Sequence, residues 1–298
     1  MSGQLKEVRE RIKSVINTQQ ITKAMKMVSA AKLRKAQMAI QQARPYANKL
    51  TSMLRNVMMY TDDSNGLVFN RATEKKRPVV IVVTSNRGLC GAYNSNIVKE
   101  AMHHIKENYQ QAIHDRSLRI IPIGKKALDV LKRQFDSSLL IRDFLDLGEK
   151  IEVERVYEFA DFLMEQFRVG NFDVVDVSYG RFRNAAMQFP ETVQYLPVAP
   201  LPKAAEEKHK IIPNYTFEPD EASLLQELVP AILKVQIHRF LLDNAASEHG
   251  ARMTAMDKAS ENADELLREL RINYNKARQA AITTELSEIV AGAAALGG

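Results

Sequence analysis

The 298 residues suffice for one large domain or two small ones, and 45% apolar with 26% charged residues is ordinary for a soluble globular protein. A single cysteine, Cys90, excludes an internal disulfide framework and suits a reducing compartment. The longest aliphatic run, Val79 to Val83, is far shorter than the ~20 residues that span a bilayer, and the N-terminus has no secretory-signal pattern. We therefore expect a soluble protein of the cell interior.

The net charge of +6 is distributed unevenly along the chain. Residues 1–60 contain twelve Lys and Arg against two Glu, whereas residues 220–298 contain eight Lys and Arg against twelve Asp and Glu. A basic first part and an acidic last part suggest that the two ends of the chain meet. Two independent interaction arms are the alternative.

Residues 1–60 are predicted to form one long helix of a coiled coil. Apolar residues recur at alternating three- and four-residue spacing over 5–15 and over 33–57, in one heptad phase. Pro45 is expected to bend this helix without ending it, because the phase continues across the proline. Between the two segments the apolar stripe is expected to shift by one or two positions and to run through Ile21, Ala24, Val28 and Ala31.

Residues 75–200 are predicted to form a Rossmann-like α/β domain with a mainly parallel sheet. Segments 77–109 and 118–135 each read as a buried strand, a glycine-containing turn and a helix. Segment 152–170 is a further amphipathic helix. Two more strands are expected at 172–182 and 191–200, the second at an edge of the sheet because it contains two prolines.

The glycine-containing turn after the first strand is the most enzyme-like feature of this domain, because phosphates often bind at such turns. Gly88 and Gly91 lack both dinucleotide spacing and the ending of a P-loop, so a structural turn is favoured over a mononucleotide site. Cys90 is more simply a small buried residue than a nucleophile. His103 and His104 are adjacent and would point in different directions on a helix. We therefore predict no catalytic residues, no metal site and no cofactor.

Residues 201–219 are predicted to be an extended linker, and residues 220–298 a second long helix. Its three-and-four spacing runs from Leu225 to Thr284 without a change of phase, and fourteen of the eighteen positions are apolar. A helix of about 70 residues is roughly 100 Å long and cannot bury such a stripe alone. We therefore expect the first and last segments to pair as an antiparallel two-helix coiled coil.

The basic stretch Ile21 to Gln37 has five cations and no acid, which suits nucleic acid, a membrane surface or a partner helix. The first sixty residues contain no Phe or Trp and only two Tyr, so aromatic stacking platforms for nucleic acid are missing. The apolar side of this stretch is mostly Ala and Met, which is poor for a membrane surface. Helix pairing is therefore favoured, together with an acidic partner for the cations.

Three segments resemble one family, the γ (central stalk) subunit of F-type ATP synthases. They read NTQQITKAMKMVSAAKLRKAQ near the start, RGLCGAYN after the first strand and YNKARQAAITTELSEIVAGAAAL at the end. The resemblance spans the whole chain and agrees with the order helix, α/β domain, helix. It implies a non-catalytic rotor shaft that couples rotation of a membrane ring to ATP synthesis and hydrolysis on other subunits.

The resemblance also implies partners. The coiled coil would fill the central cavity of an α3β3 hexamer, and the α/β domain would rest on the ε subunit and the ring of c subunits, without inserting into the membrane and without nucleic acid. The complex would lie at the cytoplasmic face of a bacterial plasma membrane. A basic coiled coil that binds nucleic acid and a nucleotide-binding α/β enzyme stay as alternatives.

By motif position, the resemblance implies contacts between the shaft and the surrounding β subunits. The cations Lys23, Lys26 and Arg34, with Lys32 and Lys35, would face acidic segments of these subunits. Met25 would be a methionine on which coupling depends, although it could also be a plain seam residue. The contacts expected from the last helix are Arg278, Gln279 and Thr283.

Overall fold

The computed structural model describes residues 2–58, 69, 76–149, 151–198 and 221–296. It divides into two compact units, one made of Met1–Ala30 with Arg252–Gly298 and the other of Ala31–Ala251. The linker predicted at 201–219 lies outside the described residues. The division of the chain at residues 60, 75, 200 and 220 stays a prediction.

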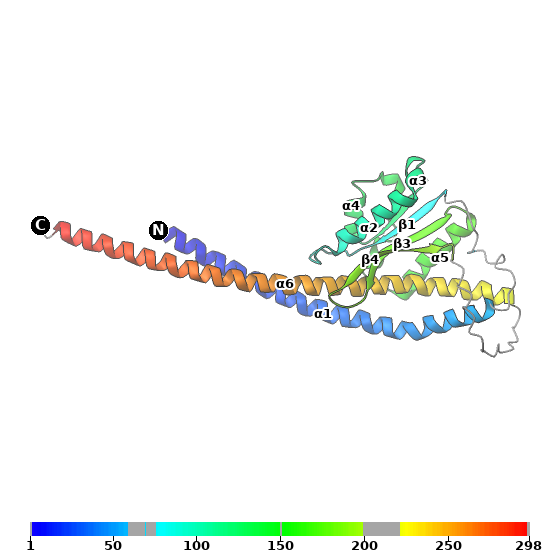
Figure 1. Cartoon of the computed structure of the whole chain (residues 1–298), viewed down its shortest axis with the longest axis horizontal. Helices are drawn as coiled ribbons and strands as arrows, with labels where there is room; N and C mark the ends of the chain where they lie inside the picture. The colour runs from blue at the N-terminus through cyan, green and yellow to red at the C-terminus, as the bar shows by residue number, and fades with distance from the viewer. Residues whose placement is uncertain (1, 59–68, 70–75, 150, 199–220, 297–298) are drawn as a thin grey trace. The chain divides into compact units, whose positions relative to one another are not determined.

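Two long helices open and close the chain (Figure 1). Helix α1 spans Ser2–Met58 and contains Pro45, and helix α6 spans Glu221–Leu296 and contains Pro230. Pro45 therefore does not end the first helix, as the unbroken heptad phase predicts. Among the described residues, neither these helices nor any other has a stretch apolar and long enough to cross a bilayer.

In the first unit, the beginning of α1 and the end of α6 pair in antiparallel fashion (Figure 1). An Arg9 guanidinium nitrogen donates to the Tyr274 hydroxyl at 2.9 Å, and Lys26 Nζ donates to Asp257 at 2.5 Å. Residues further along α1 thus meet residues further back along α6. This confirms the predicted antiparallel coiled coil.

The predicted shift of the apolar stripe on α1 is wrong. Ile21 and Val28 are 60% and 56% exposed, and Ala24 and Ala31 are exposed as well. The three-and-four spacing instead continues without a change of phase, because polar side chains occupy the seam positions in this stretch. The buried polar residues at these seam positions are Gln19, Thr22 and Ser29.

The seam predicted on α6 is confirmed along most of its length. Its positions in the first unit are buried or half-buried, from Met253 to Thr284, and those in the second unit follow the same pattern except at Arg239, which is exposed. A second buried face, which was not predicted, runs along the first turns of α6. Its members include Val229, Leu233, Ile237 and Phe240.

The second unit contains a four-stranded sheet with the order β2-β1-β3-β4. β1 (Pro78–Val83) lies parallel to both β2 (Arg119–Ile123) and β3 (Val174–Phe182). β4 (Gln188–Leu196) pairs with β3 in antiparallel fashion at the edge. The sheet is thus mainly parallel with a final edge strand, as predicted.

Helices cover both faces of this sheet. The core on one face joins the strands to α5, the first turns of α6 and Leu54 of α1, and the core on the other face joins them to α2 and α4. β1 is therefore fully buried, which explains its unbroken aliphatic sequence. The helices of the domain are α2 (Tyr93–Asn108), α3 (Gln110–His114), α4 (Lys125–Leu131) and α5 (Val153–Val169), with short 3-10 turns at Ser137–Leu139 and Leu145–Gly148.

Candidate functional site

Polar residues line the coiled coil of the first unit, and we call this group the polar seam: Gln19, Thr22, Lys26, Asp257, Ser260 and Asp264. The Thr22 and Ser260 hydroxyl oxygens lie 2.7 Å apart and both residues are buried. Gln19 donates its amide N–H to Asp264. A buried polar group is costly unless it is hydrogen-bonded, and here α1 and α6 supply partners to each other.

Gln19 and Thr22 were not predicted as seam residues, because apolar side chains were expected along the seam of α1, and Lys26 was predicted only as a contact to a partner. The signal that would have found them is the uninterrupted three-and-four spacing through Gln19, Thr22, Lys26 and Ser29. Opposite charges across the pair, by contrast, were expected from the composition. Lys26 pairs with Asp257, and Lys23 lies 4.0 Å from Asp264.

The predicted contact residues on α1 do not all have the same surroundings. Lys23 and Lys26 face acidic residues of α6 within the chain, although their side chains keep 54% and 42% of their surface exposed. Within the described part of the chain, Lys32, Arg34 and Lys35 form no ion pair and are exposed. The last three cations therefore offer charge to a partner without first breaking an internal contact.

Apolar side chains lie on the outside of the same stretch of α1, and we call them the outer stripe: Ile21, Ala24, Met27, Val28 and Ala31. Ile21, Met27 and Val28 are 60%, 68% and 56% exposed. Met25 is half-buried, between the outer stripe and the seam. Single exposed apolar residues are common, but a row of them beside cations marks a surface suited to a partner.

The three predicted contacts of α6, Arg278, Gln279 and Thr283, all lie on its exposed side. The Thr283 hydroxyl donates to the Gln279 carbonyl one turn back, at 2.9 Å. Ala277 and Ala281 are half-buried at the seam of the same turns. The helix thus presents polar and charged groups outward near the start of α1.

The last turns of α6 present an apolar surface. Ile282, Leu286 and Ile289 are 53%, 59% and 66% exposed, although each is a residue type that usually lies in a core. A Cβ added at Gly292 would meet nothing within 4 Å. An exposed helix of this kind can contact an apolar partner at low desolvation cost.

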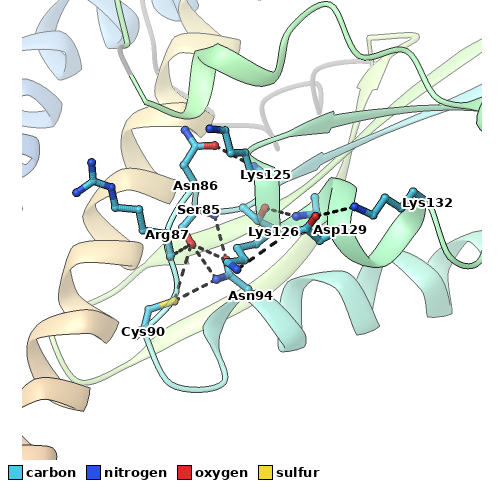
Figure 2. A network of polar contacts seen from close by, with 11 residues as sticks. Ser85, Asn86, Arg87, Cys90, Asn94, Lys125, Lys126, Asp129 and Lys132 are labelled. Carbon is cyan, nitrogen blue, oxygen red and sulfur yellow. Dashed lines mark hydrogen bonds and ion pairs between the residues drawn. The ribbon is translucent and has the colours of Figure 1, made fainter.

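The turn after β1 was the strongest candidate for a phosphate site, and its polar groups are already engaged (Figure 2). Asn86 Oδ1 accepts the Lys125 N–H at 2.8 Å, and Thr84 Oγ1 accepts the Ala127 N–H at 2.8 Å. The Ser85 carbonyl accepts the Lys126 N–H at 3.2 Å. Side chains of this turn and the N–H groups at the start of α4, the helix that follows β2, are therefore bonded to each other.

Cys90 is 2% exposed in the same network (Figure 2). Asn94 Nδ2 donates to Cys90 Sγ at 3.1 Å and to Ser85 Oγ at 2.8 Å, and Ser85 Oγ donates to the Arg87 carbonyl at 2.6 Å. These amide and hydroxyl groups are neutral and hold Cys90 inside the turn. The burial of Cys90 as a small residue is confirmed.

A second polar cluster lies on the face of β3 that α2 covers. Asp176 is 2% exposed, and its Oδ2 accepts hydrogen bonds from the Tyr109 hydroxyl at 2.5 Å and lies 2.6 Å from His104 Nε2. Burial first, and then the charge of Asp176, raise the pKa of Tyr109 well above its usual value, so the phenol stays a neutral donor. His103 instead pairs with Glu107 at 3.2 Å, so the two histidines diverge as predicted.

This cluster was missed because its members come from separate elements. Asp176 stands between the valines of a buried strand, and this charged residue was the available signal. The carboxylate holds α2 against β3 and lies inside the domain. Among the residues that the structure describes, no group of three or more His, Cys, Asp or Glu side chains is placed to hold a metal ion.

Comparison with known proteins places the whole chain in one group. The family model described as ATP synthase matches residues 4–296. The ATP synthase gamma chain of Cytophaga hutchinsonii is 45% identical over 292 residues, which cover 98% of each chain. The ATP synthase gamma chain of Flavobacterium psychrophilum is 44% identical over 294 residues and 99% of each chain, and that of Sinorhizobium fredii is 42% identical.

Solved structures agree at the level of the fold. A chain of the Euglena gracilis mitochondrial ATP synthase, described with OSCP, F1 and c-ring in rotational state 3, matches with a TM-score of 0.64 and 19% identity. That match covers 99% of this chain and 95% of the other. A chain from the rotor of the same enzyme in rotational state 1 matches with a TM-score of 0.63 and 22% identity, over 95% and 100% of the two chains.

Proposed function

The chain belongs to the gamma-chain family of ATP synthases, whose members form the central rotor shaft, and we propose that it couples rotation of a membrane ring of c subunits to ATP synthesis and hydrolysis on β subunits. The observation that carries this proposal is 45% identity to a bacterial gamma chain over 98% of both chains. The antiparallel helix pair, with its exposed final turns, is the form that a shaft requires.

We propose further that the chain is non-catalytic. In support, the Asn86 and Thr84 side chains beside the candidate turn are bonded to backbone N–H groups of α4, and Cys90 is buried. Torque transmission needs stiffness and shape rather than reactive side chains. The nucleotides and the chemistry would therefore lie on the α and β subunits around the shaft.

The proposed rotor contacts are the seven residues named from the sequence: Met25, Lys23, Lys26, Arg34, Arg278, Gln279 and Thr283. Arg34 and the three α6 residues are exposed, which supports contact with another subunit. Lys23 and Lys26 would share their charge between α6 and an acidic β segment. Met25 is half-buried, so both roles considered for it, contact residue and seam residue, fit its position.

The remaining partners are proposed from family membership. The ε subunit and the c-ring would contact the α/β domain and the nearby part of the coiled coil. The complex would sit at the cytoplasmic face of a bacterial plasma membrane, with this chain as a peripheral component.

Reconstitution tests the proposed function. The purified chain should show no ATP hydrolysis by itself and should restore steady ATP hydrolysis when mixed with α and β subunits from the same source. A chain truncated before Arg278 serves as the matched control, because it lacks the proposed α6 contacts. Hydrolysis by the isolated chain, or salt-sensitive binding of oligonucleotides in place of assembly, would support the alternative functions.

A further inference from the structure

The same turns of α1 have one polar face and one apolar face, and only one of the two can pack against α6. The polar residues Gln19, Thr22 and Ser29 face α6, and the apolar residues Ile21 and Val28 of the outer stripe face away from it. Burial of apolar surface is the main driving force of helix pairing. By that criterion the outer stripe should lie inside, and a turn of about 180° around the helix axis would bring it there.

Directed hydrogen bonds oppose such a turn. The Thr22 and Ser260 hydroxyl oxygens are 2.7 Å apart, and each also lies within 2.9 Å of a carbonyl on its own helix, that of Gln19 or Met256. Lys26 meets Asp257 at 2.5 Å one turn further along. Rotation of α1 would break the contacts between the helices, Thr22 with Ser260 and Lys26 with Asp257, whereas each hydroxyl would keep only the bond to the carbonyl on its own helix.

We propose that the polar seam is a rotational lock, in which Gln19, Thr22, Lys26, Asp257, Ser260 and Asp264 are positioning residues that fix α1 about its own axis. The lock holds the outer stripe on the outside of the helix pair. Apolar contacts are non-directional and tolerate rotation, whereas a hydrogen-bonded pair accepts one setting. The lock follows from the helix pairing alone, and only its value for rotor contacts rests on the proposed function.

The rival explanation is that the flanking apolar seam, which includes Ile12 and Val15, holds the helix without help from the polar residues. The two explanations differ in what happens when a hydroxyl is removed without a change of shape. Thr22→Val keeps the volume and branching of the side chain and makes the seam more apolar. Under the rival explanation this variant should hold α1 at least as firmly as the parent.

The test measures how often a seam position opens to solvent. Ser29 is 3% exposed, so in a full-length Cys90→Ala background a Ser29→Cys reporter should react slowly with maleimide. We expect Thr22→Val combined with Ser260→Ala to raise that reaction rate by about tenfold or more, a factor that corresponds to about 1.4 kcal/mol. Thermal stability should stay equal or rise, because the added groups are apolar.

Controls separate the lock from loose packing. Thr22→Ser restores a hydroxyl and should return the rate to that of the parent, whereas an exposed Thr18→Val change should leave it unaltered. An unchanged rate in the double variant with full helix content would overturn the proposal. If the double variant fails to fold, the maleimide reaction rate of the Thr22→Val variant is used instead, and an unchanged rate there would overturn the proposal. Either outcome leaves the reconstitution result, and thus the shaft assignment, unaffected.

Discussion

At the scale of single residues, Asp243 of α6 is a half-buried carboxylate beside several charges. Loss of solvent raises its pKa, and the nearby Arg239, Arg44 and Arg181 lower it by less. A carboxyl whose pKa is raised on folding stabilises the fold in its protonated form, and this contribution is lost as pH rises through the folded-state pKa. At neutral pH the ionised side chain therefore destabilises the second unit.

We expect Asp243→Asn to stabilise the protein at pH 7 by about 0.5–1 kcal/mol, because the amide avoids the desolvated charge. The gain should shrink as pH falls through the raised pKa of Asp243, because the protonated carboxyl carries no charge to desolvate. Thermal denaturation of both proteins between pH 4 and pH 8 checks this. A loss of stability at pH 7 would mean that the arginine contacts outweigh desolvation.

Two exposed residues of α6 allow the proposed tail contact to be tested. Arg278→Ala with Gln279→Ala should lower ATP hydrolysis or torque in the reconstituted complex several-fold, because one cation and one amide that face outward are removed. Asn275→Ala with Lys276→Ala removes the same groups from the preceding exposed turn and serves as the control. Equal activities of the two double variants would count against the assignment.

Met25→Lys tests the proposed role of Met25. A cation added between Lys23 and Lys26 should bind acidic partner segments more tightly and retard their release. We expect proton pumping per ATP to fall while ATP hydrolysis continues, and Met25→Leu to behave like the parent. Unchanged pumping efficiency in Met25→Lys would leave Met25 as an ordinary seam residue.

At the scale of elements, the turn between β2 and α4 depends on Gly124. Its φ of +93° is rarely adopted by other residues, and an added Cβ would lie 2.4 Å from the Thr84 carbonyl oxygen. We expect Gly124→Ala to destabilise the α/β domain by at least about 2 kcal/mol. At Gly88 the nearest atom to an added Cβ is Lys126 Cε at 3.9 Å, so Gly88→Ala should cost less than about 0.5 kcal/mol. Chemical denaturation measures both, and similar losses would refute the account of this turn.

Local periodicity predicted most elements correctly. β1 was recognisable because a strand buried on both faces is continuously apolar, and α5 because it ends at Gly170, which adopts a left-handed φ of 84°. On α1 the search for apolar residues at heptad spacing gave a wrong result, because polar residues at the seam were interpreted as a shift of the apolar stripe. Polar seam residues such as Thr22 become intelligible only beside their partner, here Ser260, which lies 238 positions later in the chain.

Contacts between distant segments were the least predictable part. Tyr93 donates to the Asn244 side chain at 2.7 Å, and the Ser247 hydroxyl donates to the Gly180 carbonyl at 2.8 Å. These bonds attach α6 to the α/β domain, yet each residue alone is an ordinary polar side chain in its element. The contact residues of the candidate site came from motif position and not from periodicity, and they stay predictions.

At the scale of the whole molecule, the helix pair and the α/β domain have different roles. The helix pair supplies length and stiffness, and the sheet domain, packed on both faces, supplies a firm body around the first turns of α6. No step of the proposed function requires this chain to bind nucleotide. We propose that its contribution is mechanical and depends on the faces that it presents to other subunits.

The most direct measurement of this claim is rotation. A Val169→Cys variant in a Cys90→Ala background offers an exposed attachment point on α5, at 64% exposure, for a bead or filament. With α and β subunits fixed to a surface, addition of ATP should turn the bead continuously in one direction. If the assembled complex hydrolyses ATP while an attached and unobstructed bead does not turn, this chain does not act as a rotor shaft.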